Sequence, residues 1–226
     1  MRPDLIHFIR LSLIEGIGPV NAKKLIAHRG GAEEVFKSSR KQLLSIDGIG
    51  PSYVDKILSA DTARAADALL ETESKAGNNI FCYLDKAYPR RLNNCEDAPL
   101  LIFTQGEVDL NQAYVLSIVG TRHATEYGTR ATEDFIKAIS PLRPLIVSGL
   151  AHGIDVAAHK AAMRFDCPTV GVLAHGLDMV YPAIHRKVAD RMCEQGGLIS
   201  EFPIGIKPDK ERFPMRNRIV AGMSDA

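Results

Sequence analysis

Short β-rich runs alternate with amphipathic helical patterns along the second half of the chain, an order that few folds can accommodate. The expected strands are Val115–Val119, Leu145–Val147, Thr169–Leu173 and Leu198–Ile199, and the helical patterns between them lie near 126–140, 153–165 and 184–195. Strands that alternate with helices form right-handed βαβ units, which place the strands parallel in one sheet. The sequence therefore predicts an α/β fold, a Rossmann-like parallel sheet with helices on both faces.

The first 75 residues have a different pattern, because apolar residues recur every three or four positions and hardly any segment alternates with period two. This spacing is typical of amphipathic helices. Two further β-rich runs, 80–84 and 100–103, follow a polar turn-forming stretch at 75–79. We therefore expect a small all-α domain at 1–75 and an α/β domain at 80–226.

An internal repeat lies within the helical segment. LSLIEGIGPVNAKKLI (11–26) and LLSIDGIGPSYVDKIL (43–58) share the pattern helix, G-I-G-P hairpin, helix. Such a hairpin points free backbone N–H groups outward at a helix N-terminus, which suits a phosphate. The repeat resembles a doubled helix-hairpin-helix module, and the expected phosphate contacts are Gly16, Gly18, Gly48 and Gly50.

The G-I-G-P hairpins also have a purely structural interpretation. Each can be a tight packing corner with Ile17 or Ile49 as its core residue. Glu15 and Asp47 sit beside the glycines, and their negative charge repels phosphate. Both interpretations stay open at the level of sequence.

Glycine-containing loops follow the expected strands at three places. In an open parallel sheet, ligands bind beyond the carboxyl ends of the strands. Gly120, Gly149 and Gly153 free backbone N–H groups there for an anion, and Arg122 adds a fork-shaped charge. None of the loops is G-x-G-x-x-G or a P-loop, which disfavours a dinucleotide or ATP site. The combination fits a phosphate diester, whereas the alternative is an ordinary βα turn with Arg122 paired to a carboxylate.

Composition excludes several classes of protein. With 28 Lys+Arg against 27 Asp+Glu, the net charge of +1 rules out a bulk-basic nucleic-acid coat. Trp is absent, which weakens any reading that needs a broad aromatic platform. No apolar run approaches a membrane span and the N-terminus lacks a signal peptide. The four cysteines are far apart, as expected of free thiols in a cytoplasmic protein. No His/Cys cluster has metal-ligand spacing, so neither a metal nor a cofactor is expected.

Several motifs together resemble one family, the DNA-processing protein A (DprA/Smf) family. They are VGTRHATEYG (119–128), SGLAHGIDVAAHKAA (148–162), LAHGLDMVYP (173–182), GGLISEFPIG (196–205) and FPMRNRIVAGMSDA (213–226). The resemblance covers about residues 80–226, and the helical front end fits members with a helix-hairpin-helix or SAM-like N-terminal domain. It implies a non-enzymatic single-stranded DNA-binding protein that protects incoming DNA during natural transformation, hands it to the RecA recombinase and forms a homodimer.

The resemblance also assigns residues to a DNA-phosphate pocket. These residues are Gly120, Thr121, Arg122, Ser148, Gly149 and Gly153, with basic support from Lys187, Arg216 and Arg218. The last two belong to a basic segment between Pro203 and Val220, for which a solvated face is the alternative. Asp155 and His159 match the family's G-I-D-x-x-A-H pattern and are expected to be architectural rather than catalytic. His152 and His185 depart from it, which predicts some pH dependence of binding.

The end of the sequence also departs from the family pattern. The chain stops at Ala226, where the family would continue into another core strand. We therefore expect a C-terminally truncated Rossmann-like domain with an open sheet edge.

Three alternative functions compete with this assignment. One is a nucleotide-hydrolysing enzyme of the lysine-decarboxylase-like group, although Gly196–Glu201 keeps only part of that signature. Another is a helix-hairpin-helix glycosylase or nuclease, for which the second half is the wrong fold. The third is a module that binds only a protein partner.

Overall fold

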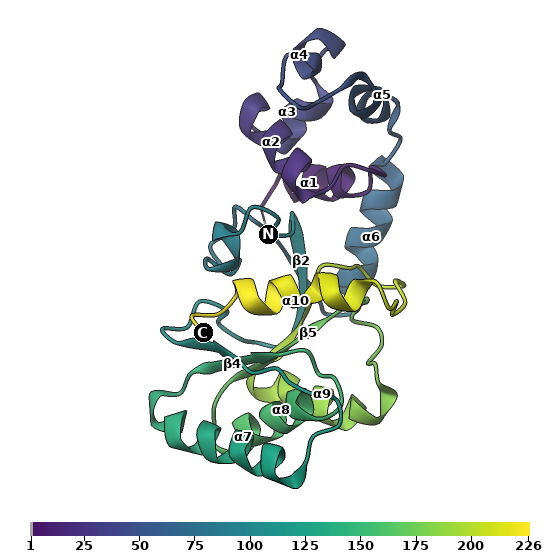
Figure 1. Cartoon of the computed structure of the whole chain (residues 1–226). Helices are drawn as coiled ribbons and strands as arrows, with labels where there is room; N and C mark the ends of the chain where they lie inside the picture. Colours follow the sequence, from purple (N-terminus) through teal and green to yellow (C-terminus); the bar gives the residue numbers. More distant parts are fainter. Residues whose placement is uncertain (1) are drawn as a thin grey trace.

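The structure, a computed structural model, describes residues 2–226 and contains one six-stranded mixed sheet (Figure 1). The strands run in the order β1-β2-β6-β5-β4-β3. Their bounds are β1 (Asn79–Cys82), β2 (Leu101–Gln105), β3 (Val115–Ser117), β4 (Leu145–Ser148), β5 (Thr169–Leu173) and β6 (Gly197–Ser200). Every residue of β4, β5 and β6 is buried, as expected of strands that are covered on both faces.

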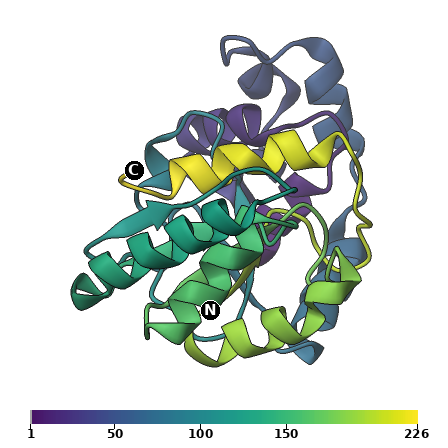
Figure 2. The ribbon, with the colours of Figure 1, turned by 60° about the horizontal axis from the view of Figure 1, so that its bottom comes forward.

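The four strands β3 to β6 are parallel and lie side by side in chain order. Their connections are α7 (Glu126–Ile139), α8 (Ile154–Arg164) and α9 (Arg186–Gln195). Because right-handed crossovers that always step in one direction put every helix on the same face, these three helices form a single layer (Figure 2). The opposite face is covered by α10 (Arg212–Gly222), which the sequence analysis did not identify as a helix (Figure 1). The predicted parallel sheet with helices on both faces is confirmed from Val115 onward.

The two remaining strands extend the sheet in the opposite sense. β1 pairs antiparallel with β2, and β2 pairs antiparallel with β6. The loop between β1 and β2 holds only a short 3₁₀ turn, Leu92–Asn94, and no crossover helix. A connection without a crossover helix favours antiparallel pairing, so the parallel pattern does not extend to this edge.

Helices occupy the chain up to Lys75, and they stand at one end of the molecule (Figure 1). They are α1 (Leu5–Ser12), α2 (Pro19–Arg29), α3 (Ala32–Phe36), α4 (Arg40–Leu44), α5 (Pro51–Ser59) and α6 (Ala63–Lys75). Their buried apolar side chains are continuous with those on one side of the sheet. At this junction the carboxylate of Glu73 accepts hydrogen bonds from Asn78 Nδ2 and from the backbone N–H of Ile204, both at 2.7 Å. A buried, fully used carboxylate of this kind fixes α6 to the segment between β6 and α10.

The last residues run along the free edge of β3. Asp225 N donates to Val115 O and Ser117 N donates to Ala226 O, both at 2.8 Å. The Asp225 carboxylate also pairs with Arg91, whose side chain is mostly buried. The edge that was expected to be open therefore carries two backbone hydrogen bonds. Within residues 2–226, no helix combines the length and the apolar character needed to cross a membrane.

Candidate nucleic-acid interface

A cleft of about 560 Å³ lies where β3 and β4 end, beside the first turn of α10. We call it the strand-end cleft. It is lined by Val119, Gly120, Arg122, Ala151, Asp155, Tyr181, Pro208, Lys210, Phe213, Pro214, Arg216 and Asn217. The loops after β3, β4 and β5 form one wall, and the segment leading into α10 forms the other. Segments that are distant in sequence thus meet at the carboxyl ends of the strands, where an open parallel sheet binds its ligands.

Positive charge and aromatic surface meet at the mouth of the cleft. Arg122 is exposed, and its guanidinium carbon lies 5.7 Å from the centre of the Phe213 ring. The Phe213 ring in turn lies 5.7 Å from that of Tyr181, tilted by 38°. Tyr181 is 53% exposed, so one face of the pair is free to receive another flat group. Lys210 is exposed on the same wall. An aromatic surface that shares one cleft with two cations suits a nucleotide, because a base can stack while the phosphate is neutralised.

Arg216 lies beneath the cleft and is only 5% exposed. Its Nη1 donates to the carbonyl oxygens of Gly149, at 2.7 Å, and Val172, while its Nε donates to Asn217 Oδ1 at 3.1 Å. Burial lowers the pKa of this guanidinium, and the nearby Asp155 carboxylate partly offsets that effect. Arg122, Lys210 and Arg216 line the cleft against the carboxylate of Asp155, so the cleft as a whole favours an anion.

The position of Arg216 explains why residue 149 is glycine. A Cβ at Gly149 would lie 2.3 Å from Arg216 Nη2, closer than any side chain tolerates. The backbone N–H of Gly149 is already used, because it donates to Asp155 Oδ2 at 3.2 Å, and Ala151 N lies 3.4 Å from the same oxygen. Gly149 therefore accommodates the arginine, whereas its predicted role was to offer a free N–H to phosphate. Asp155 orders the loop, in line with the architectural role expected of it.

The remaining predicted pocket residues divide between the surface and the interior. Gly120, Thr121 and Arg122 are exposed at the end of β3, and Gly153 packs against them. Thr121 O accepts the N–H of Ile154 at 3.2 Å, which holds this loop onto the start of α8. Ser148 is fully buried, and its hydroxyl donates to Ile118 O at 2.5 Å. The structure thus gives Ser148 an internal partner instead of access to the cleft.

Two of the predicted basic residues lie away from the lining of the cleft. Arg218 is ion-paired with Glu201 and donates to Asp97 O at 2.8 Å, so its fork is used inside the protein. This pairing also engages the glutamate that a lysine-decarboxylase-like enzyme would need. Lys187 is exposed on α9 and is not part of the cleft wall. The sequence pattern could not separate Arg216 from Arg218, because their roles depend on which way each faces from α10.

The histidines of this region are largely buried. His159 is fully buried, and desolvation lowers its pKa to about 3. Thr169 donates its hydroxyl proton to Ile146 O, so the 2.7 Å contact between His159 Nδ1 and Thr169 Oγ1 requires a proton on Nδ1. A neutral histidine with this tautomer is a structural group. The rings of His152 and His185 stack edge to face at 5.0 Å, and burial together with the charges of His152 and Lys160 lowers the pKa of His185.

The two G-I-G-P hairpins are connected by reciprocal contacts. Lys24 Nζ donates to Asp47 O at 2.6 Å, and Lys56 Nζ donates to Glu15 O at 3.0 Å. The two lysines occupy equivalent positions of the repeat, so each copy closes the hairpin of the other. Ile17 and Ile49 are buried, as the packing-corner interpretation requires. The outward-facing backbone remains available, since Gly18 and Gly50 are the N-cap residues of α2 and α5 and nothing lies within 4 Å of a Cβ placed on either.

Four aromatic or polar residues of the cleft wall had no predicted contact with DNA: Tyr181, Lys210, Phe213 and Asn217. Lys210 and Phe213 stand in the basic segment, and Tyr181 ends the third strand-end loop. Aromatic residues interleaved with basic ones were a usable signal. Only the fold shows that these segments face one another.

Comparison with known proteins identifies the family of the chain. Residues 79–226 match the family model described as DNA recombination-mediator protein A. The chain belongs to this family, the DprA/Smf family that the motifs resemble. Protein Smf of Synechocystis is 33% identical over 224 residues, which cover 97% of this chain and 56% of that protein. The chain spans about half the length of the curated relatives it matches.

Two solved structures resemble the chain. DNA processing protein A from Streptococcus pneumoniae matches with a TM-score of 0.77 and 30% identity, covering 99% of this chain and 76% of that one. DNA processing protein A from Helicobacter pylori, described by its single-stranded DNA binding mode, matches with a TM-score of 0.60 and 27% identity over 66% of each chain. The first likeness includes the helical segment as well as the sheet.

Proposed function

We propose that this protein binds single-stranded DNA in the strand-end cleft and takes part in DNA processing. The observation that carries the proposal is the junction of Arg122, Lys210 and the Tyr181–Phe213 pair at one mouth. Single strands offer both an accessible base face and a backbone charge, and proteins recognise them by combining stacking with cations. In a duplex the base faces are already stacked, so the aromatic pair favours single strands.

Each part of the cleft has a role in this proposal. Arg122 and Lys210 contact phosphate, with Gly120 and Thr121 allowing the backbone to approach. Arg216 supplies charge from below, and Gly149 leaves room for it. Ser148 and Gly153 shape the loops, Arg218 holds α10 in place through its ion pair with Glu201, and Lys187 acts at longer range. Asn217 accepts from Arg216 through Oδ1, which leaves its amide N–H groups to donate to the strand.

The helical segment has a secondary role in the proposal. We assign residues 1–75 to a helix-hairpin-helix, SAM-like domain and residues 80–226 to the DprA-type Rossmann-like domain. The hairpin glycines Gly16, Gly18, Gly48 and Gly50 would contact phosphate through the backbone. Because neutral N–H donors are weaker than a charged fork, and because Glu15 and Asp47 lie beside them, the hairpins assist binding and do not carry it.

The wider role follows from the family and from the DNA-binding names of its members. We propose that the whole protein protects incoming single strands in the cytoplasm during natural transformation, transfers them to a RecA-type recombinase and acts as a homodimer. It would do so without enzymatic turnover. The residues of the cleft hold and shield a strand, which needs no bond to be broken.

Substitution of the aromatic pair tests the proposal. Phe213→Ala should weaken binding of a labelled oligothymidylate by about tenfold, because one stacked base contributes roughly 1–3 kcal/mol, and should change duplex binding little. Tyr181→Ala, at a half-exposed position, should do the same with less effect on folding. Labelled DNA and ATP incubated with the protein and Mg²⁺ should stay intact. Unchanged single-strand affinity in both folded variants would refute the cleft, and turnover that is lost in Arg122→Ala would show an enzyme.

A further inference from the structure

A second cavity adjoins the strand-end cleft on the far side of Arg122. It has a volume of about 650 Å³ and lies between the start of α7 and the first turns of α8. We call it the α7–α8 groove. Its lining consists of Arg122, His123, Ala124, Thr129, His152, Gly153, Val156, Ala157 and Lys160. Among residues 2–226, no acidic side chain lines it, whereas an arginine, a lysine and two imidazoles do. Such one-sided charge favours an anion.

Arg122 is shared by the groove and the strand-end cleft. An extended chain of phosphates that leaves the cleft over Arg122 therefore enters the groove directly. The guanidinium fork has five N–H donors and can bridge two neighbouring phosphates. The two cavities thus form one continuous path across the loop after β3.

His152 and Lys160 line the far wall of the groove, and the buried His185 packs behind His152. His185 is 8% exposed, and its Nε2 is buried with no hydrogen-bond partner among the described residues. It packs edge to face on His152, with 5.0 Å between the ring centres. Lys160 is close enough for its charge to lower the pKa of His185. Arg122 and Lys160 therefore bring two cations to the groove, no carboxylate lines it in the part of the chain that the structure describes, and a phosphate would be attracted there.

We propose that the α7–α8 groove is a second phosphate subsite, which takes the backbone of the same DNA strand where it leaves the strand-end cleft. This inference rests on the proposed function and extends it from one nucleotide to a track. Lys160 and His152 contact the phosphate that follows the one on Arg122, and His123 lies at the outer rim. The occupant is a phosphodiester chain, because the cations extend along a path that is continuous with the cleft.

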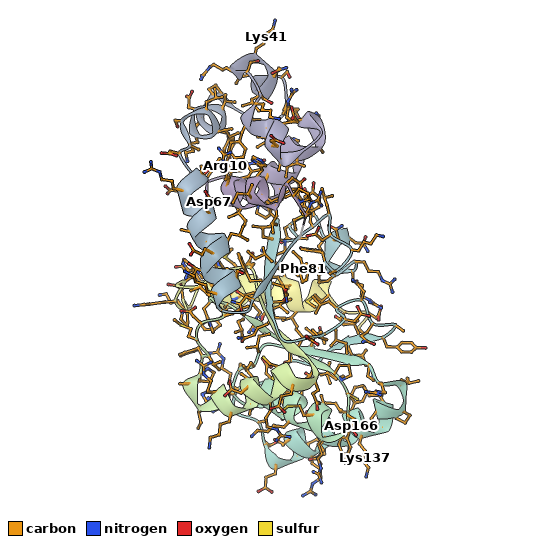
Figure 3. All side chains as sticks on the ribbon, turned by 180° about the vertical axis from the view of Figure 1, so that it is seen from behind. Arg10, Lys41, Asp67, Phe81, Lys137 and Asp166 are labelled. Carbon is orange, nitrogen blue, oxygen red and sulfur yellow. The ribbon has the colours of Figure 1, made fainter. Side chains whose placement is uncertain are left out.

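Three lysine variants test the groove against the cleft. Lys160→Gln removes a groove charge, Lys210→Gln removes a cleft charge, and Lys137→Gln removes an exposed charge from α7 outside both cavities (Figure 3). Affinity for an oligothymidylate is measured between 50 and 200 mM salt. Each lost phosphate contact should flatten the slope of log affinity against log salt concentration by about 0.7. The affinity advantage of the parent over the variant should therefore shrink about 2.6-fold as salt rises from 50 to 200 mM. We expect a flatter salt slope for Lys160→Gln and for Lys210→Gln, the sum of both effects in the double variant, and the slope of the parent for Lys137→Gln.

The outcomes separate the two proposals. If Lys210→Gln changes affinity and slope while Lys160→Gln behaves like Lys137→Gln, the groove is refuted and the cleft stands. If only Lys160→Gln responds, DNA binds at the groove without passing through the cleft, and the continuous track is refuted together with the cleft. If all three bind like the parent, both proposals fail.

A second measurement locates the strand without relying on affinity. The imidazole signals of His152 and His123, followed by NMR, should shift when oligothymidylate is added, because both rings line the groove that the strand would occupy. The shift should be smaller in Lys160→Gln. Signals that respond to inorganic phosphate at equal ionic strength but not to the oligonucleotide would overturn the proposal, because they would show a site for small anions.

Discussion

Removal of the Arg122 guanidinium should weaken single-strand binding more than removal of any other exposed charge. Arg122 borders both cavities and lies 5.7 Å from the Phe213 ring, so on the proposed path one side chain would contact two phosphates beside the stacking surface. A charge-assisted hydrogen bond contributes about 1.5–3 kcal/mol. Because Arg122 is exposed and its charge is screened by salt, we expect Arg122→Gln to cost a binding free energy at the lower end of this range. A loss of about 1.5 kcal/mol of binding free energy corresponds to a roughly 12-fold higher dissociation constant.

Fluorescence anisotropy of a labelled oligothymidylate at several salt concentrations measures both the affinity and its salt slope. The slope of Arg122→Gln should be flatter by about 0.7 for each phosphate released. Arg122→Lys separates charge from geometry, because lysine keeps the charge but cannot reproduce the planar fork. We therefore expect its slope to match that of the parent while its affinity falls. Lys137→Gln is the control for a charge that touches neither cavity.

Two results would refute this reasoning. Arg122→Gln could bind with the affinity and salt slope of the parent, which would remove Arg122 from the DNA path. Alternatively, Lys137→Gln could weaken binding equally, which would show that the loss of affinity depends on net charge and not on the position of Arg122. Loss of folding should not confuse the comparison, because an exposed substitution of this kind changes stability by only about 0.5 kcal/mol or less. Urea unfolding of each variant checks that assumption.

Two further predictions concern the hairpins and the buried histidine. The double variant Gly18→Leu, Gly50→Leu should fold, because both glycines have an extended backbone and open space around them. Compared with the parent, it should lose more affinity for duplex DNA than for single strands. If the folded double variant binds every DNA form like the parent, the hairpins do not touch DNA. The His159 pKa of about 3 lies below the usual value near 6.5, so the unfolded state takes up a proton first as the pH falls, and stability is lost below about pH 6.5. Urea unfolding at pH 7.5 and 5 should show a loss of about 2 kcal/mol, and His159→Gln should flatten this dependence; an equal loss in that variant would assign it to other groups.

Local chemistry in the sequence determined the elements and their class. Short continuous β-rich runs indicate strands that are buried on both faces, and a 3.6-residue period indicates a helix with one apolar face, so the six strands and the helices between them were predicted close to their observed positions. The glycine-containing turns after β3 and β4 were predicted for a similar reason, because the backbone of a turn favours glycine at specific positions of the local sequence. The repeat showed that Lys24 and Lys56 are equivalent positions. It did not show that each lysine binds the hairpin of the other copy.

Only the tertiary structure decided which side chains face the strand-end cleft. Arg216 and Arg218 stand two residues apart on α10, yet one lies under the cleft and the other pairs with Glu201. Lys210 and Phe213 meet Arg122 because the segment before α10 folds back across the strand ends. Burial and the direction of a side chain depend on contacts between segments that are far apart in the chain. Those contacts arise when the sheet and its covering helices close around a common core, and no local pattern records them.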